Sequence, residues 1–301
     1  MPKKFLLFDI DDTIATFDHE SGMASLQKHI RDKRDIFDEA LAQKIYAFMN
    51  TCFLAFHGRA LGRETEESKK LYLLIQEAAQ KVEGLENFSD IHWSRELWIY
   101  IAGGGSISPA TAVEAAHSFW KGLALATVLY DDARKLFRWL NKSLDGYNYK
   151  HSPTERWKTI FVTSSDARLK ANHDNTTLLY DPDHSNTQKF IRVNWIIPNS
   201  PFGSSVFIGD PVSKPHPDFW QRVIEGIGYN QAEDLAIMTG DSPRSDLTGL
   251  DQFGIVPILI DREGNFTPQE VPQAKYVISS LEDLKNIMAI EEINKKEGGT
   301  L

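Results

Sequence analysis

Three aspartates fall within four positions near the start of the chain, in the stretch FLLFDIDDTIATFD. They are Asp9, Asp11 and Asp12, and they follow a short apolar run that is typical of a buried strand. Carboxylates this close repel one another, and each raises the pKa of the next unless a cation or hydrogen bonds intervene. Because side chains alternate along a strand, Asp9 and Asp11 are expected on one face. Paired carboxylates suit Mg²⁺, which often binds one or two of them together with a substrate phosphate.

Three later stretches carry polar side chains at or just beyond the ends of predicted strands. Thr163 lies in IFVTSS, Lys214 in SKPHPDFW, and Asp241 in MTGDSPRSD. Lys214 is expected on a loop, because a residue before proline is disfavoured in the helical region. Asp246 is expected near the first turn of a helix capped by Ser242, where a negative charge is favourable. Each has an ordinary structural explanation alone, but together they predict one site at one edge of a sheet.

Strands and helices alternate in the second half of the chain, and this pattern predicts a Rossmann-like parallel α/β sheet with helices on both faces. The first strand is expected over residues 4–10. The remaining strands are expected over residues 159–164, 205–210, 235–241 and 255–261, and the helices between and after them over 131–144, 217–228 and 280–290. The polar segment 170–204 is hard to assign. It is expected to form an extra hairpin or flap, with FIRVNWIIP as an added strand.

A helical block separates the first strand from the rest of the sheet. Amphipathic patterns predict helices over residues 23–56, 66–82, 90–103 and 108–125, with starts at Ser89-Asp90 and Ser108-Pro109. The expected domains are therefore an α/β core of residues 1–17 and 127–301 and an all-α cap of residues 18–126. An insertion directly after the first strand is expected at the carboxyl edge of the sheet, where open α/β sheets bind ligands.

Composition narrows the class of protein. The 301 residues are 42% hydrophobic and 25% charged, as in soluble globular proteins. The net charge of −9 argues against a nucleic-acid partner, which would require a basic surface. The single cysteine, Cys52, is expected to be buried and inert, and it allows no disulfide within the chain. With neither a signal-peptide pattern nor an apolar stretch of membrane-spanning length, the chain is expected in the cytoplasm, without a membrane partner.

The four motifs, in this order, resemble those of the haloacid dehalogenase-like (HAD) hydrolase superfamily. DIDDT at residues 9–13 resembles the first motif, Thr163 the second, Lys214 in KPHPDFW the third, and GDSPRSD at residues 240–246 the fourth. The helical block resembles, by its position, the C1-type cap of subclass I. The resemblance covers residues 3–17 and 127–290.

This resemblance implies a phosphatase that acts through an aspartyl-phosphate. Asp9 would be the nucleophile, and Asp11 the general acid and then the general base. Thr163 would bind the phosphoryl oxygens, and Lys214 would neutralise the nucleophile and the transferring group. The substrate would be the phosphomonoester of a small metabolite, such as a sugar phosphate or a nucleotide.

The resemblance also implies Mg²⁺ as the cofactor. Asp9, the backbone carbonyl of Asp11, and Asp241 would hold the metal. Asp246 would support Lys214 or the waters of the metal, and Thr13 would have a supporting role.

Other activities on the same scaffold stay open at this point. A phosphomutase would use the same residues, and a non-catalytic phosphate-binding module is a third hypothesis. The sequence does not predict the oligomeric state.

The cap offers several side chains that could contact a substrate. For His57, Arg59, Arg63, Lys69 and Lys70, a solvated helix face or a loop is the favoured interpretation. The tryptophans of the cap, at positions 93, 98 and 120, are expected in its core rather than against the substrate. In the core domain, His216 is expected to begin a helix.

Overall fold

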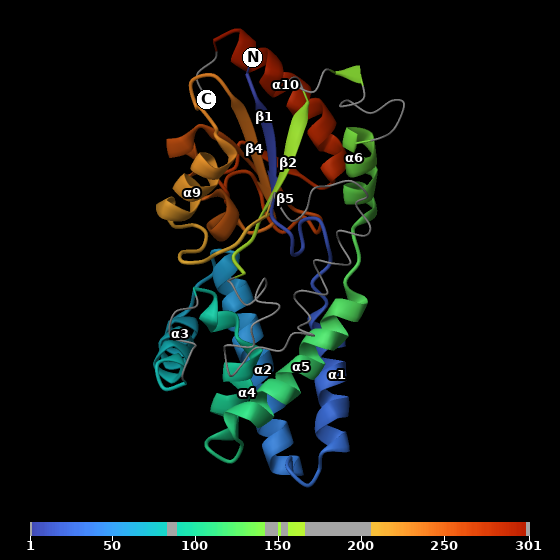
Figure 1. Ribbon diagram of the computed structural model, residues 1–301, viewed down its shortest axis with the longest axis vertical. Coiled ribbons are helices and arrows are strands. Elements are labelled where there is room, and N and C mark those ends of the chain that lie inside the picture. Colours follow the sequence, from blue (N-terminus) through green and yellow to red (C-terminus); the bar gives the residue numbers. More distant parts are fainter. Residues whose placement is uncertain (1, 83–88, 142–149, 152–155, 166–205, 299–301) are drawn as a thin grey trace.

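The structure is a computed structural model that describes residues 2–82, 89–141, 150–151, 156–165 and 206–298 (Figure 1). The hairpin or flap expected within residues 170–204, including the strand FIRVNWIIP, lies outside the described residues.

The described strands form a six-stranded sheet in which all strands are parallel, in the order β3-β2-β1-β4-β5-β6. The strands are β1 (Lys4–Phe8), β2 (Trp157–Val162), β3 (Val206–Phe207), β4 (Leu235–Gly240), β5 (Ile255–Ile260) and β6 (Tyr276–Ile278). This is the strand order of a Rossmann-like sheet, so the predicted fold class is confirmed. The short strand β6 was not predicted, because a run of three residues carries too little pattern.

Helices cover both faces of the sheet (Figure 1). Leu7 of β1 packs in a core with α9 (Pro217–Ile227), whereas its neighbour Phe8 packs in the opposite core with α6 (Asp131–Asn141) and α10 (Leu284–Lys296). Strand β1 lies between β2 and β4. It is therefore buried on both faces, which explains its continuous apolar sequence.

Strand β1 ends at Phe8, so the strand predicted over residues 4–10 was too long. The backbone N–H of Asp9 still donates to a carbonyl of β4, but the chain then turns, and the carbonyl of Ile10 accepts from the N–H groups of residues 14 and 15. Asp12 has a left-handed backbone with φ of 53°. A turn, rather than strand alternation, therefore sets the directions of the first-motif aspartates.

The cap consists of helices inserted between β1 and β2 (Figure 1). They are α1 (His19–Asp32), α2 (Glu39–Ala60), α3 (Glu66–Ala79), α4 (Arg95–Gly103) and α5 (Pro109–Ala126). The pattern over residues 23–56 is two helices rather than one, because Asp38 caps the start of α2. Ser94, not Ser89-Asp90, caps α4, whereas the start predicted at Ser108-Pro109 is confirmed. Among the described helices, none combines the length and apolar character that crossing a membrane requires.

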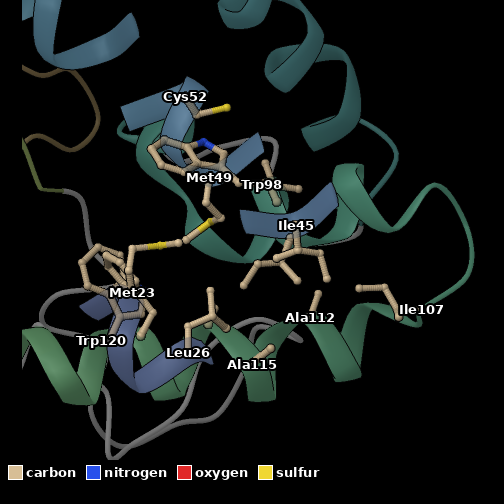
Figure 2. Packing of buried hydrophobic residues seen from close by; sticks show 14 of the residues in the cluster. Met23, Leu26, Ile45, Met49, Cys52, Trp98, Ile107, Ala112, Ala115 and Trp120 are labelled. Carbon is tan, nitrogen blue, oxygen red and sulfur yellow. The ribbon is translucent and has the colours of Figure 1, made fainter. Parts of the chain in front are cut away.

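The cap has a hydrophobic core of its own, to which all five of these helices contribute; Figure 2 shows part of it. Met23, Met49 and Trp98 lie there together with Ala115 of α5. Cys52 is buried in the same core, and burial raises the pKa of its thiol to about 12. This agrees with the expectation that Cys52 is inert.

The two chain segments that join the cap to the sheet lie side by side. Ala15 forms an antiparallel bridge with Leu129, and the N–H of Thr16 donates to the carbonyl of Val128 over 2.9 Å. Outside this bridge the first cap helix starts at residue 19 and the last ends at residue 126. The domain boundaries at 17/18 and 126/127 remain a proposal.

The cap contains a histidine that should make folding sensitive to pH. The ring of His19 stacks on that of Phe53, with centroids 3.8 Å apart and planes 7° apart. Burial, and then the charge of Arg95, lower the pKa of His19 from 6.5 to about 4. Between these values the unfolded chain binds a proton that the folded chain does not, so stability falls as pH drops.

His19→Phe should keep the ring and remove this dependence. We expect the wild-type chain to lose about 1–2 kcal/mol more than the variant between pH 7 and pH 4.5, after allowance for solvent screening. Urea unfolding at both pH values measures the difference. Equal pH dependence in the two proteins would contradict the prediction.

Candidate active site

Three residues predicted from the motifs lie just beyond the carboxyl ends of adjacent strands. Asp9 follows β1, Thr163 follows β2 and Asp241 follows β4. The strand order reverses between β1 and β4, and open α/β sheets have a crevice at the carboxyl ends of the strands at such a point. A cavity with a volume of about 170 Å³ lies there. Its sheet side is lined by six of the seven predicted catalytic, metal and supporting residues, Asp9, Asp11, Thr163, Lys214, Asp241 and Asp246, whereas Thr13 does not line it.

Lys214 is the centre of the hydrogen bonding in this cavity. Its Nζ donates to Oδ1 of Asp9 and to Oδ1 of Asp246, each over 2.6 Å, and to the carbonyl of Val162 over 3.3 Å. The side chain is only 1% exposed. Burial by itself lowers the pKa of Lys214, but the charges of Asp246 and Asp9 outweigh it and raise the pKa. The ammonium is therefore charged at neutral pH, and it stands on the loop before α9, as predicted.

Asp246 is held by the turn that follows β4. The N–H of Ser242 donates to its Oδ2 over 2.9 Å, within a π-helical turn over Pro243–Leu247. Gly240 makes room for it, because a Cβ at this position would lie 2.2 Å from Oδ2 of Asp246. Both carboxylate oxygens thus have partners in the protein. This suits a residue that positions Lys214 better than one that ligates a metal.

Three carboxylates gather beside Lys214. One oxygen from each of Asp9, Asp241 and Asp246 lies within 4.8 Å of the others. Burial raises the pKa of Asp9 to about 6 against the opposing charge of Lys214. Burial, followed by the charges of Asp246 and Asp9, raises the pKa of Asp241 well above 3.8.

A hard divalent cation fits this set. Three carboxylates against one ammonium leave excess negative charge in an enclosed site, and the ligand atoms offered are all oxygens. Asp241 also accepts from Oγ1 of Thr13 over 3.2 Å, which orients it. The side chain of Asp11 is not part of the cluster, and the metal-binding role predicted for Asp11 used its backbone carbonyl.

Sequence reasoning missed the residues that fix the turn of the first motif. Oδ1 of Asp12 accepts from the N–H of Phe17 over 3.0 Å and from the hydroxyl of Tyr130 over 3.3 Å. Arg262 donates to the carbonyl of Asp12 over 3.4 Å and to that of Thr13 over 2.9 Å. Arg262 also stacks on the Tyr130 ring at 4.0 Å. Nothing local marks Arg262, because Asp12 and Thr13 lie about 250 positions earlier in the chain.

The cap closes the opposite side of the cavity. Of the five cap residues considered as substrate contacts, only His57 lines it. Arg59 is instead paired with Glu64 over 2.8 Å, and Lys69 with Glu66 over 2.7 Å. Trp98 is buried in the cap core as expected, but the other two tryptophans, at positions 93 and 120, also line the cavity. The remaining cap residues in the wall include Phe53, Asp90, Arg95 and Glu96, and Phe17, just before the cap, also lines it.

A direct contact joins the cap to the metal side of the cavity. Oγ of Ser242, the residue after Asp241, donates to the carbonyl of Ala60 at the end of α2 over 2.7 Å. Arg244 in the same turn lies 3.5 Å from Glu64 of the cap. The turn that positions Asp246 is therefore also a docking point for the cap.

Solved structures share the fold of this chain along nearly its whole length. A protein from Bacillus subtilis, described as a HAD-hydrolase bound to magnesium, is 16% identical with a TM-score of 0.52, over 96% of this chain and 99% of that one. A 2-haloacid dehalogenase from Pseudomonas syringae pv. Tomato DC3000 is 14% identical with a TM-score of 0.50, over the same shares of the two chains. No protein-family model matches the sequence, and the search of curated proteins found no match. At these identities the likeness concerns the fold alone.

Proposed function

We propose that this chain, which has the fold of the HAD-like hydrolases, is a Mg²⁺-dependent phosphatase of small-metabolite phosphomonoesters. The observation that carries the proposal is the buried ammonium of Lys214 between Asp9 and Asp246, with Asp241 beside them at the end of the next strand. A carboxylate with a cation fixed on one oxygen can approach a phosphate ester without prohibitive repulsion. The cap encloses the same cavity, and this supports the proposal that the substrate is small.

Hydrolysis would proceed in two displacements at phosphorus. In the first, a carboxylate oxygen of Asp9 forms a bond to phosphorus while the bond to the ester oxygen breaks. The departing oxygen takes a proton from Asp11. In the second, Asp11 takes a proton from water, the water oxygen bonds to phosphorus, and the bond to Asp9 breaks. Inorganic phosphate leaves, and both aspartates return to their starting forms.

The other residues would act by position and charge. Lys214 offsets the negative charge of Asp9 and of the phosphoryl oxygens, and Thr163 would donate to one of those oxygens. Asp9, the Asp11 carbonyl and Asp241 would hold Mg²⁺. When bound, the metal supplies positive charge to the phosphoryl group as the transition state develops.

Two other activities differ from this proposal in what they release. A phosphomutase would return the phosphoryl group to a sugar and release little phosphate, and a phosphate-binding module would release none.

We further propose that the chain acts in the cytoplasm on a small phosphorylated metabolite. The single cysteine and the net charge of −9 support this.

Metal removal tests the proposed function. Purified protein treated with EDTA should lose turnover of p-nitrophenyl phosphate almost completely, because three carboxylates would then repel the phosphate. Added Mg²⁺ should restore the rate. Phosphate release that persists without metal would contradict the metal-dependent mechanism. A folded protein that releases phosphate from no phosphomonoester, with any divalent metal, would favour a mutase or a binding module.

A further inference from the structure

Arg95 is a fully buried arginine with two unused donors. It begins α4 and is 0% exposed. Its Nη1 donates to the carbonyl of Trp93 over 2.7 Å, but its Nε and Nη2 have no hydrogen-bond partner among the described residues. These two nitrogens lie on the same edge of the guanidinium, so they form the fork that binds two adjacent acceptors. Arg95 also lines the cavity above the aspartates.

Aromatic rings surround this guanidinium. Its carbon lies 4.0 Å from the Trp98 ring centroid, 5.0 Å from that of Phe119 and 5.2 Å from that of Trp120. Burial lowers the pKa of Arg95 to about 9, so the group is still charged at neutral pH. Cation–π contacts explain why the charge is tolerated. They leave the fork unexplained, because an apolar side chain of similar size would fill a purely structural position without burying unpaired donors.

Three aromatic rings in the wall beside Arg95 are nearly parallel. Phe53 lies 8° from the plane of Phe17 and 17° from that of His57, with centroids 6.3 Å and 5.7 Å away. All three line the cavity, as do Asp90 and Glu96. A second anionic group on the substrate would satisfy the fork but would face these two acids. A planar heterocycle suits the rings, the fork and the two acids together. It stacks on rings, offers adjacent acceptors to the fork and donates N–H groups to carboxylates.

We propose that the cap side of the cavity is a nucleobase subsite, so that the substrate is a nucleoside monophosphate. Guanine fits best, because its O6 and N7 are the acceptor pair that an arginine fork binds, and its N–H groups can donate to Asp90 or Glu96. The inference rests on the proposed function, in which the nucleoside is the leaving group. Arg95 is then the specificity-determining residue.

Arg95→Met tests the subsite through substrate choice. We expect kcat/KM for guanosine 5′-monophosphate to fall roughly tenfold to a hundredfold, the range for one bidentate contact. kcat/KM for ribose 5-phosphate, which lacks the base, should change less than about twofold. Arg59→Met is the matched control. Arg59 also stacks on a cap ring, at 4.2 Å from Tyr72, but does not line the cavity. It should leave both substrates unaffected.

Binding of guanosine, which has no phosphate, separates this inference from the proposed function. Guanosine should quench the tryptophan fluorescence of the wild-type chain without metal, and Arg95→Met should weaken its binding roughly tenfold or more. Quenching without phosphatase activity would support the subsite and contradict the proposed phosphatase function. Phosphatase activity without guanosine binding would overturn the subsite alone. An Arg95-dependent preference for 3-phosphoglycerate over the nucleotide would also overturn it, in favour of a second anion.

Discussion

Replacing Asp9 with asparagine is expected to abolish phosphatase turnover, with a loss of at least about a thousandfold in kcat. The amide keeps an oxygen that can accept from Lys214, which now binds the carboxylate over 2.6 Å. The fold should therefore survive, while the nucleophile that forms the aspartyl-phosphate is gone. Release of phosphate from p-nitrophenyl phosphate with saturating Mg²⁺ measures the effect.

Asp251→Asn provides the control for this substitution, because it removes the same charge from an exposed position outside the cavity. It should leave kcat unchanged. A rapid acid quench of the wild-type reaction, followed by mass spectrometry, should show phosphate on the peptide that contains Asp9. An Asp9→Asn protein that keeps more than about a tenth of the wild-type kcat would rule out Asp9 as nucleophile.

Lys214→Met should damage both stability and catalysis. The substitution leaves the buried carboxylates of Asp9 and Asp246 without their shared cation, which costs about 3–5 kcal/mol at neutral pH. The pKa of Asp9 is already raised to about 6 by burial with Lys214 in place, and loss of the lysine raises it further. The folded variant then binds more protons than its unfolded chain, so its stability rises as pH falls. Catalysis should fall by at least about a hundredfold.

A control variant separates the stability effect of Lys214→Met from the effect of replacing any lysine with methionine. Lys135→Met removes an exposed pair with Glu282 and should leave the free energy of unfolding nearly unchanged. Urea unfolding at pH 8 and pH 5.5 should show the Lys214→Met defect shrinking at the lower pH. Added Mg²⁺ should also reduce it, because the cation replaces part of the missing charge. A defect that is independent of both pH and metal would indicate lost packing rather than unpaired acids.

Much of the sheet and the site could be predicted because their signals are local. Strand β4 is a continuous apolar run, and the residue after it, Asp241, inherits its position from the strand end. Lys214 could be placed on a loop from the proline that follows it. The positions of such residues can be predicted without knowing their distant partners, so the sequence alone assigned them to one edge of the sheet.

The cap residues that line the cavity could not be predicted, because their positions depend on contacts between helices. The sequence WSRELW places Arg95 between two tryptophans, and that pattern was the available signal. Its burial under the rings of α5 appears only once α4 and α5 pack together. Trp120 was assigned to the core alone for the same reason, since a core residue and a cavity-lining residue have the same helical spacing. The turn at Asp12 was missed because a left-handed aspartate leaves little trace in an apolar pattern.

Because Ala15 pairs with Leu129, the cap is an insertion that could be removed or exchanged as one unit, here called a cassette. The chain leaves the sheet and returns to it at neighbouring backbone positions, so the whole helical block could be excised and the gap closed with a tight turn. The sheet would keep its strand order, because the excised segment crosses none of its hydrogen-bonded ladders. Exchange of this cassette between relatives would then be a direct route by which the same aspartates and lysine acquire new substrates.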